Sequence, residues 1–352
     1  MLEQRHILTI REELDSSKRP IFFFHDDADG LSSFLLLYRH IGEGKGVIVK
    51  QTPKIDRANY TRKVKEYMPD KVFVLDIAMV EQDFLDDMAE IGLKVVWIDH
   101  HNPLERQKVL YFNPRIRNIK DDTCVTRICY EVVKKDIWIA MVGSIGDWQM
   151  PDFRKEFVEK YPELLDKSVE KPEEALFGQK IGTLVRIFSF VLKGKTEEVV
   201  KCMKILTRIN DPYEILEQKT AAGRFIYKRH EGIKEYYDAL FKKAKEHVAT
   251  DEIFIYVYKG AKFSFSSELS NELLYNYPSK IILVGREKSG EIKYSIRAAG
   301  KNIPPILKKA LEGIEGFGGG HEHACGAVIK EKFNKHFIKQ FKRALGINEK
   351  AA

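Results

Sequence analysis

The stretch Trp97-Ile98-Asp99-His100-His101-Asn102-Pro103 decides how this chain is interpreted. It closes an apolar run, Leu93 to Ile98, that is typical of a buried β-strand. The run ends abruptly in one carboxylate and two imidazoles, which are costly to bury without partners. In an α/β protein, ligands bind at the carboxyl ends of the strands. Carboxylate together with imidazole is the ligand mixture expected for Mn²⁺, Zn²⁺ or a related ion.

The composition is that of a soluble globular protein. The chain has 352 residues, 44% hydrophobic and 32% charged, which is enough for two domains. Its 59 Lys and Arg against 52 Asp and Glu give a net charge of +7, which permits an anionic substrate. We expect a cytoplasmic protein without membrane contact, because no signal peptide and no membrane-spanning run is apparent. The four cysteines, which form no Cys-x-x-Cys pair, predict neither a disulfide framework nor a zinc ribbon.

The first half of the chain alternates strand and helix patterns. Apolar runs predict strands at 21–24, 46–50, 71–75, 93–98 and 109–112. Amphipathic or apolar segments predict helices at 31–40, 81–91, 123–134 and 137–145. Such alternation indicates a parallel sheet with helices on both faces, and the apolar character of the strands fits burial on both sides.

The pattern changes in the second half. Residues from about 155 to 247 are mostly helical in pattern, and strand patterns return at 253–258, 280–284 and 292–296, the last after a hairpin turn at 288–291. We therefore predict an α/β protein with a catalytic domain at 1–190, a helical linker at 191–248 and a smaller α/β domain at 249–352. The active site is expected in the cleft between the domains.

Four apolar elements of the first half each end in acidic or imidazole groups. They end in the segments His25-Asp26-Asp27-Ala28-Asp29-Gly30, Asp76, Asp99-His100-His101 and Gly146-Asp147. Taken singly, each carboxylate could be a helix cap or a turn residue. In a parallel sheet the first three would meet at one edge, where close carboxylates without a counter-charge are strongly unfavourable. Divalent cations would remove that repulsion, so the set as a whole predicts a metal site.

These four segments, in this order, resemble the sequential motifs of the DHH phosphoesterases. That superfamily includes RecJ-type nucleases, nanoRNases and manganese pyrophosphatases. In the second half, Gly318-Gly319-Gly320-His321, followed by Ala324 and Gly326, resembles the signature of the DHH-associated C-terminal domain. Tyr294-Ser295-Ile296-Arg297 resembles the Ser-x-Arg element that precedes this signature. The resemblance thus covers most of the chain.

The resemblance implies two divalent metal ions, Mn²⁺ with Mg²⁺ as the alternative. His25 and Asp27 would bind the first ion; Asp29, His100 and Asp147 would bind the second; Asp76 would bridge both. His101 would face the substrate phosphate as a catalytic residue, with Asp99 as its orienting neighbour. The spacing of the first motif differs among branches of the superfamily, so His25 could instead act as a general acid or contact the phosphate.

The second domain is expected to bind the substrate. Glycines let backbone N–H groups approach an anion closely, and an arginine can hold a phosphate with two hydrogen bonds. The alternative for a bare glycine triplet is a flexible loop or a tight turn. The predicted substrate-binding residues are Ser295, Arg297, Gly318, Gly319, Gly320 and His321.

The activity expected is that of a RecJ-like exonuclease, a phosphodiesterase that hydrolyses single-stranded DNA, RNA or oligonucleotides to nucleoside monophosphates. Replication or repair proteins are candidate partners. Two alternatives remain open: a small-molecule phosphoesterase of the nanoRNase, cyclic dinucleotide or phosphoadenosine type, and a non-catalytic scaffold of a replication complex. The intact set of aspartates and histidines argues against the scaffold. A Gly-x-Ser-x-Gly nucleophile motif does not occur, which fits metal-dependent hydrolysis.

Overall fold

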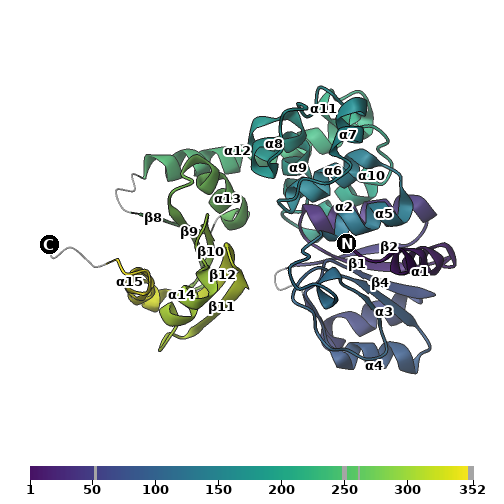
Figure 1. Cartoon of the computed structure of the whole chain (residues 1–352), viewed down its shortest axis with the longest axis horizontal. Coiled ribbons are helices and arrows are strands. Elements are labelled where there is room, and N and C mark those ends of the chain that lie inside the picture. Colours follow the sequence, from purple (N-terminus) through teal and green to yellow (C-terminus); the bar gives the residue numbers. More distant parts are fainter. Residues whose placement is uncertain (51–53, 248–251, 261, 348–352) are drawn as a thin grey trace. The chain divides into compact units, whose positions relative to one another are not determined.

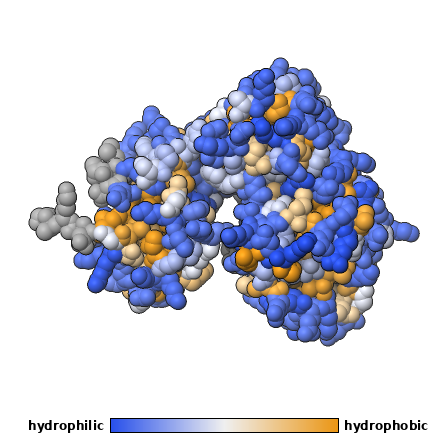
Figure 2. All heavy atoms as spheres, in the orientation of Figure 1, coloured by the Kyte–Doolittle hydropathy of each residue, from blue (hydrophilic) through white to orange (hydrophobic). Residues whose placement is uncertain are grey.

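The computed structural model describes residues 1–50, 54–247, 252–260 and 262–347, and the chain divides into two compact units. Unit 1 comprises Met1–Glu231 and unit 2 comprises Gly232–Ala352. Hydrophilic side chains cover most of the face of each unit that Figure 2 shows. Within the described residues, none of the helices combines the length and the apolar character that crossing a membrane requires.

Unit 1 is built around a five-stranded parallel sheet (Figure 1). Its strands are β1 (Ile21–His25), β2 (Lys45–Val49), β4 (Lys71–Leu75), β6 (Lys94–Ile98) and β7 (Leu110–Phe112). Their order is β2-β1-β4-β6-β7. The chain runs outward from β1 to β2 and then returns to β4 on the other side of β1. The gap between β1 and β4 is therefore the switch point at which open α/β sheets bind ligands.

Helices cover both faces of this sheet because side chains alternate along each strand. Phe22 and Phe24 point into one core and Phe23 into the other. The first core includes the helices α1 (Gln4–Asp15), α2 (Ala28–Ile41), α5 (Val125–Val133) and α6 (Ile137–Gly146). The second includes the π-helix η1 (Arg57–Thr61), α3 (Arg62–Tyr67) and α4 (Gln82–Glu90). Figure 1 shows the two layers on either side of the strands.

The segment after α6 is helical, as the sequence predicts. It contains α7 (Arg154–Lys160), α8 (Pro172–Gly178), α9 (Lys180–Val191), α10 (Thr196–Leu206), α11 (Pro212–Leu216) and α12 (Ala221–Glu246). Helices α7 to α11 and the start of α12 share the first core of unit 1, to which Ile226 belongs. The division between the units falls inside α12, at Glu231 and Gly232. Short elements elsewhere in unit 1 are β3 (Lys54–Ile55), β5 (Met79–Val80) and η2 (Pro114–Ile116).

Unit 2 contains a mixed sheet in the order β11-β12-β10-β9-β8. The strands are β8 (Ile253–Lys259), β9 (Ile281–Lys288), β10 (Glu291–Ala298), β11 (Gly316–His321) and β12 (Ala324–Lys330). β8 pairs in parallel with β9, and the remaining pairs are antiparallel. Ser289 and Gly290, both at positive φ, form the predicted hairpin turn. The helices are α13 (Ser266–Asn276), α14 (Ile303–Ala310), η3 (Glu331–Phe333) and α15 (Asn334–Ala344).

The predicted α/β architecture is confirmed. The glycine-rich segment is neither a flexible loop nor a tight turn, because it forms the edge strand β11. Its partner β12 follows it after a two-residue turn and supplies the hydrogen bonds that order it. The sequence patterns predicted neither the strand β12 nor the helices α1, α3, α13 and α14. The pairing between β11 and β12, which orders the glycines, could therefore not be predicted from the sequence.

Candidate metal centre

The predicted ligands come together at the switch point of the unit 1 sheet. Asp76 follows β4 and adopts a left-handed conformation, with φ of 57°. Its backbone N–H donates to the carbonyl oxygen of Ile98 at 3.0 Å, which ties this turn to the end of β6. The side chain of Asp76 is only 2% exposed. Strained backbone that the surrounding structure holds in place is common at functional sites.

The first group of ligand atoms belongs to His25, Asp27 and Asp76. Nδ1 of His25 lies 2.7 Å from Oδ2 of Asp27 and 3.3 Å from Oδ2 of Asp76. Asp27 caps α2 by accepting a hydrogen bond from the Gly30 N–H at 2.9 Å. A Cβ at Gly30 would lie 2.4 Å from the His25 carbonyl oxygen, so only glycine lets the first turn of α2 approach the end of β1.

The second group belongs to Asp29, His100 and Asp147. The buried Asp29 carboxylate accepts hydrogen bonds from two N–H groups in the first turn of α5, those of Val125 at 3.0 Å and Thr126 at 2.7 Å. A helix N-terminus stabilises a carboxylate in this way. Nδ1 of His100 lies 3.7 Å from Oδ2 of Asp147.

His100 also connects the two groups. Its Nδ1 lies 3.1 Å from the carbonyl oxygen of Asp122, and its Nε2 lies 3.4 Å from Oδ1 of Asp76. A backbone carbonyl that accepts from one ring nitrogen leaves the other nitrogen available as a ligand. A third group of ligand atoms consists of Asp76, His100 and His101. Asp76 and His100 thus each belong to two of the three groups.

Asp147 reaches this centre because α6 packs unusually close to α2. A Cβ at Gly146 would lie 2.6 Å from Cβ of Ala28, and one at Gly143 would lie 2.6 Å from Cβ of Ser32, both on α2. Glycines at these positions let α6 come near enough for its end to place Asp147 beside Asp29. In the sequence motif Gly146-Asp147, the glycine thus allows close helix packing and the aspartate is a candidate metal ligand.

The electrostatics of the centre fit divalent cations. Burial raises the pKa of Asp29 to about 7, and the charge of Asp76 adds to the shift. Burial also raises the pKa of Asp147, despite the opposing charge of His100. Burial opposes ionisation of Asp76 too, yet contacts with His100 and His25 hold its pKa below the usual range. Burial likewise disfavours the charged forms of these two histidines, but the surrounding carboxylates outweigh it and raise their pKa values. Protons thus supply the positive charge that metal ions would otherwise bring.

His101, a member of the third group, also pairs with Asp99. Nδ1 of His101 lies 2.7 Å from Oδ1 of Asp99, and the His101 N–H donates to Oδ2 at 3.1 Å. Nδ2 of Asn113 donates to the His101 carbonyl at 2.9 Å and lies 3.4 Å from Asp99. Sequence analysis missed Asn113, although it shows the same signal as the others, a polar residue directly after an apolar strand.

In unit 2 four of the six predicted substrate-binding residues, Ser295, Arg297, Gly319 and His321, occupy two neighbouring rows of the sheet. Ser295 pairs with Gly326, which pairs with Gly319 on β11; Arg297 pairs with Ala324, which pairs with His321. Residues that face each other across a sheet, and residues two apart on a strand, share one face. The rows therefore form one surface, which we call the small-residue platform, made of Ser295, Arg297, Gly319, His321, Ala324 and Gly326.

The glycines of β11 divide between the two faces. A Cβ at Gly319 would meet nothing within 4 Å, so this position opens the small-residue platform. A Cβ at Gly318 would lie 2.7 Å from the Gly326 carbonyl oxygen and 3.0 Å from the side chain of Leu307 on α14. Gly320 has φ of 147° and would bring a Cβ within 2.3 Å of the Ala324 carbonyl oxygen. Packing therefore accounts for Gly318 and Gly320, and Gly319 alone lies on the platform.

Arg297 is held in place by α13. Its Nε donates to Oδ1 of Asn271 at 2.7 Å, and its Nη2 donates to Oγ of Ser267 at 3.0 Å. Burial lowers its pKa to about 10, against the opposing influence of Cys325 and Glu268. The acceptors of these two hydrogen bonds are neutral, so they orient the guanidinium without cancelling its charge. Sequence analysis missed Ser267 and Asn271, which are polar positions in a helix and carry no distinguishing signal.

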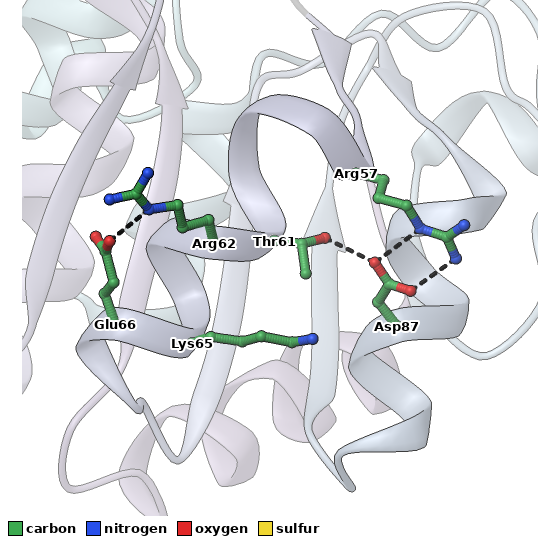
Figure 3. Close-up of a pocket in the computed structure, with 6 residues that line it drawn as sticks. All are labelled: Arg57, Thr61, Arg62, Lys65, Glu66 and Asp87. Atoms are coloured by element: carbon green, nitrogen blue, oxygen red, sulfur yellow. Dashed lines mark hydrogen bonds and ion pairs between the residues drawn. The ribbon is translucent and has the colours of Figure 1, made fainter.

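A pocket of about 600 Å³ lies on the surface of unit 1 (Figure 3). Its arginines are paired within the pocket. Arg57 contacts Asp87 at 2.7 Å, and Arg62 contacts Glu66 at 2.6 Å. Because these carboxylates neutralise the arginines, we assign no function to it. The lining residues are Arg57, Thr61, Arg62, Lys65, Glu66 and Asp87.

Comparison with known proteins identifies two family domains in the chain. The N-terminal domain of the DHH family matches residues 21–151, and the DHHA1 domain matches residues 251–346. The first match spans the metal centre, and the second spans the small-residue platform. No curated protein matches the chain by sequence.

Solved structures share the fold at low sequence identity. RecJ from Thermus thermophilus in complex with Mn²⁺ is 15% identical, with a TM-score of 0.67 over 98% of this chain and 55% of that one, so the chain spans about half the length of that RecJ. An exonuclease RecJ bound to manganese is 14% identical, with a TM-score of 0.64 over 98% and 94% of the two chains. The DHH domain of a protein assigned to a family of ribosomal proteins is 15% identical, with a TM-score of 0.69 over 99% and 90%.

Both family domains occur in the expected order, the DHH domain before the DHHA1 domain. The fold that surrounds them is that of RecJ. The chain belongs to the DHH superfamily of phosphoesterases and carries a C-terminal DHHA1 domain.

Proposed function

We propose that this protein is a metal-dependent phosphodiesterase that removes nucleotides from single-stranded nucleic acid or oligonucleotides and releases nucleoside monophosphates. One observation carries the proposal: the buried carboxylate of Asp76, which has two oxygen atoms, belongs to two of the three ligand groups. A carboxylate shared in this way suits a pair of adjacent divalent ions, the arrangement common to many phosphodiesterases. The structures of RecJ bound to manganese support Mn²⁺ as the ion, with Mg²⁺ as the alternative.

In this proposal His25 and Asp27 would hold one ion, Asp29, His100 and Asp147 would hold the other, and Asp76 would contribute to both. When bound, the two ions would activate water and neutralise charge on the phosphate. The protein contributes the fixed positions of the donors. Asp29 is anchored by the first turn of α5 and Asp27 by the first turn of α2, so neither carboxylate has to reorganise on binding.

His101 is proposed to contact the substrate and to provide a proton for the leaving oxygen. Its Nδ1 lies against Asp99 at 2.7 Å, which fixes the ring orientation and directs Nε2 away from Asp99. Asp99 is buried, and Asn113 holds it. Asp99 therefore acts as a positioning residue, which stabilises the charged imidazole before the proton is transferred.

The small-residue platform of unit 2 is proposed to bind the sugar-phosphate portion of the substrate. Arg297 would contact a phosphate, and the missing side chain at Gly319 would leave room for the ribose or deoxyribose beside it. Ser295 and His321 lie on the same face and offer hydrogen-bonding groups. A protein that binds such a strand is a candidate partner of replication or repair proteins.

The variant Asp76→Asn tests the metal assignment. Asparagine tolerates the left-handed conformation, so we expect the melting temperature to stay within a few degrees. Loss of the shared carboxylate should weaken Mn²⁺ binding at least tenfold and reduce hydrolysis of a labelled oligonucleotide by at least about a hundredfold. Calorimetric titration with Mn²⁺ and single-turnover kinetics provide the measurements. Asp83→Asn, which removes an exposed carboxylate from α4, is the control.

A length series from the dinucleotide upward tests the substrate. The proposal expects cleavage to continue on strands of ten or more nucleotides, with monophosphates as products. If only the shortest members of the series are hydrolysed, the substrate is a small oligonucleotide and long strands are excluded. A metal-dependent reaction would be refuted if the Asp76→Asn variant, or the wild-type protein in excess chelator, hydrolysed the oligonucleotide at an unchanged rate.

A further inference from the structure

The face of unit 2 that carries the small-residue platform continues into one further row of the sheet. Phe317 on β11 pairs with Val328 on β12, which pairs with Lys293 on β10. Each of these residues lies two positions along its strand from the middle row of the platform, so their side chains share its face. We call Phe317, Val328 and Lys293 the aromatic row. The platform and the aromatic row together form three successive rows.

Phe317 presents its ring to solvent. It is 68% exposed, more than any other aromatic residue that the structure describes. β11 forms the edge of the sheet, and its next residue on this face is Gly319, which has no side chain to cover the ring. A single exposed apolar residue is ordinary on a protein surface, so exposure alone assigns no function. The interpretation of Phe317 depends on the groups that share its face.

The three rows carry basic groups and no carboxylate. Their ionisable side chains are Lys293, Arg297 and His321. Arg297 lies in the row farthest from Phe317 and is the proposed phosphate contact. Gly319 lies in the row between them, where a Cβ would meet nothing within 4 Å. An anionic strand that enters at Arg297 therefore meets positive charge first, open space next and the aromatic ring last.

The positive charge of this face ends at the aromatic row. In the next row Glu291 pairs with Lys330, and their side chains form an ion pair at 2.9 Å. Glu315 lies beside them, because its carbonyl oxygen accepts from the backbone N–H of Lys330, and its side chain contacts Lys332 at 3.6 Å. Carboxylates thus neutralise both lysines, and this row offers little attraction to a phosphate. The ligand part that suits the position of Phe317 is apolar and flat.

The order of these features matches the parts of one nucleotide. Rows on one face of a sheet follow each other at about 6.5 Å, so the row of Phe317 lies about 13 Å from the row of Arg297. With a phosphate at Arg297, the sugar would pass over Gly319 and the base would reach the ring of Phe317. Exposed aromatic rings on which bases stack are a common feature of proteins that bind single strands.

We propose that Phe317 stacks on a nucleobase of the substrate, the base of the nucleotide whose phosphate Arg297 contacts. This inference rests on the proposed phosphodiesterase function and makes it more specific, because it assigns to unit 2 a subsite for a complete nucleotide. Binding at this subsite depends on the presence of a base and not on its identity, since every base has a flat face.

Binding of two strands with equal charge tests the stacking. One strand is labelled octathymidylate, and the other has the same backbone with eight abasic residues. Both are titrated with protein in excess chelator. Phe317→Ala should weaken binding of octathymidylate roughly tenfold, the effect expected for one stacked base, and should change binding of the abasic strand less than twofold. Equal losses on both strands, or no loss on octathymidylate, would overturn the inference.

A tryptophan at the same position gives a direct signal of stacking. Phe317→Trp should keep the affinity of the wild type, because the indole ring also offers a flat aromatic face. The fluorescence that it adds to that of the wild type should be quenched by octathymidylate and not by the abasic strand. If octathymidylate leaves the added fluorescence unchanged, Phe317 does not stack on a base.

Leu8→Ala is the control for the loss of an exposed apolar side chain. Leu8 is 53% exposed on α1 of unit 1. Its replacement should leave the affinities for both strands unchanged. Because Phe317 is also exposed, Phe317→Ala should keep the melting temperature of the wild type, so a loss of affinity in this variant does not reflect unfolding.

Hydrolysis of octathymidylate with Mn²⁺ is measured separately, so the two proposals can fail independently. If the wild type binds through Phe317 but does not hydrolyse the strand, the proposed function is refuted and the stacking stands. If the wild type hydrolyses the strand and Phe317→Ala binds both strands normally, the stacking is refuted and the function stands. A wild type that neither binds nor hydrolyses the strand refutes both.

Discussion

At the scale of single residues, the glycines of β11 show that one residue type serves two purposes within three positions. Gly318 faces Leu307 and the backbone of β12, where there is no room for a side chain. Gly319 faces open space on the small-residue platform. Alternation along a strand separates the two roles, so neighbouring positions in the same motif respond to mutation for different reasons.

Substitution of each glycine by alanine should separate these roles. We expect Gly318→Ala to lower the free energy of unfolding by about 1–3 kcal/mol, because α14 or β12 must move to accept the methyl group. Gly319→Ala should leave stability unchanged or raise it by up to about 1 kcal/mol, because glycine in a strand loses more conformational entropy than alanine. Urea denaturation of both variants measures the difference. Equal destabilisation would contradict the described orientation of β11.

At the scale of elements, the proposed metal centre depends on how closely helices approach one another. α6 carries Asp147 at its C-terminal end, and it touches α2 through Gly143 and Gly146. α5 presents its first N–H groups to Asp29 on α2. The three helices thus bring together a carboxylate from each of two motifs that lie more than a hundred residues apart in the chain.

A methyl group at the contact between α6 and α2 should disturb the centre. In Gly146→Ala the new Cβ would lie 2.6 Å from that of Ala28, so α6 has to shift away from α2. We expect a loss of about 1–3 kcal/mol in stability and weaker binding of Mn²⁺ to the group that includes Asp147. Thermal unfolding and Mn²⁺ titration measure both.

Gly178→Ala provides the comparison for this variant. Gly178 also ends a helix, α8, but a Cβ there would meet nothing within 4 Å. The stability of the Gly178→Ala variant and its affinity for Mn²⁺ should both stay close to those of the wild type. If the two variants bind Mn²⁺ equally well, the packing of α6 does not control the position of Asp147.

At the scale of the whole molecule, the two proposed sites lie in different units. All of the proposed metal ligands lie between residues 25 and 147, in unit 1, and the small-residue platform lies in unit 2. Each unit has its own sheet and its own hydrophobic core. Metal binding should therefore depend on unit 1 alone, whereas affinity for a strand should need both.

A chain shortened to residues 1–247 tests this division. It keeps α12, whose first part packs into the core of unit 1 through Ile226. We expect Mn²⁺ affinity within about twofold of the full chain, and at least tenfold weaker binding of octathymidylate, because the charge of Arg297 is lost. Circular dichroism verifies folding before either titration. Loss of Mn²⁺ binding by a folded short chain would show that unit 2 contributes to the metal centre.

The sequence by itself determined the parallel α/β architecture of unit 1 and the positions of the acidic and imidazole groups at the ends of its elements. Both follow from local information: the apolar strands, the helical periodicity, and the polar residue that ends each apolar run. Asn113 obeys the same local rule and could have been found with it.

Only the tertiary structure decided which strands are neighbours and how closely the helices pack. The order β2-β1-β4-β6-β7 places Asp76 beside His25, and the glycines of α6 bring Asp147 to Asp29. Likewise, the pairing of β10, β12 and β11 places Gly319, Ser295 and Arg297 on one face. These contacts join residues far apart in the chain, and their energies depend on partners that no local window of sequence contains.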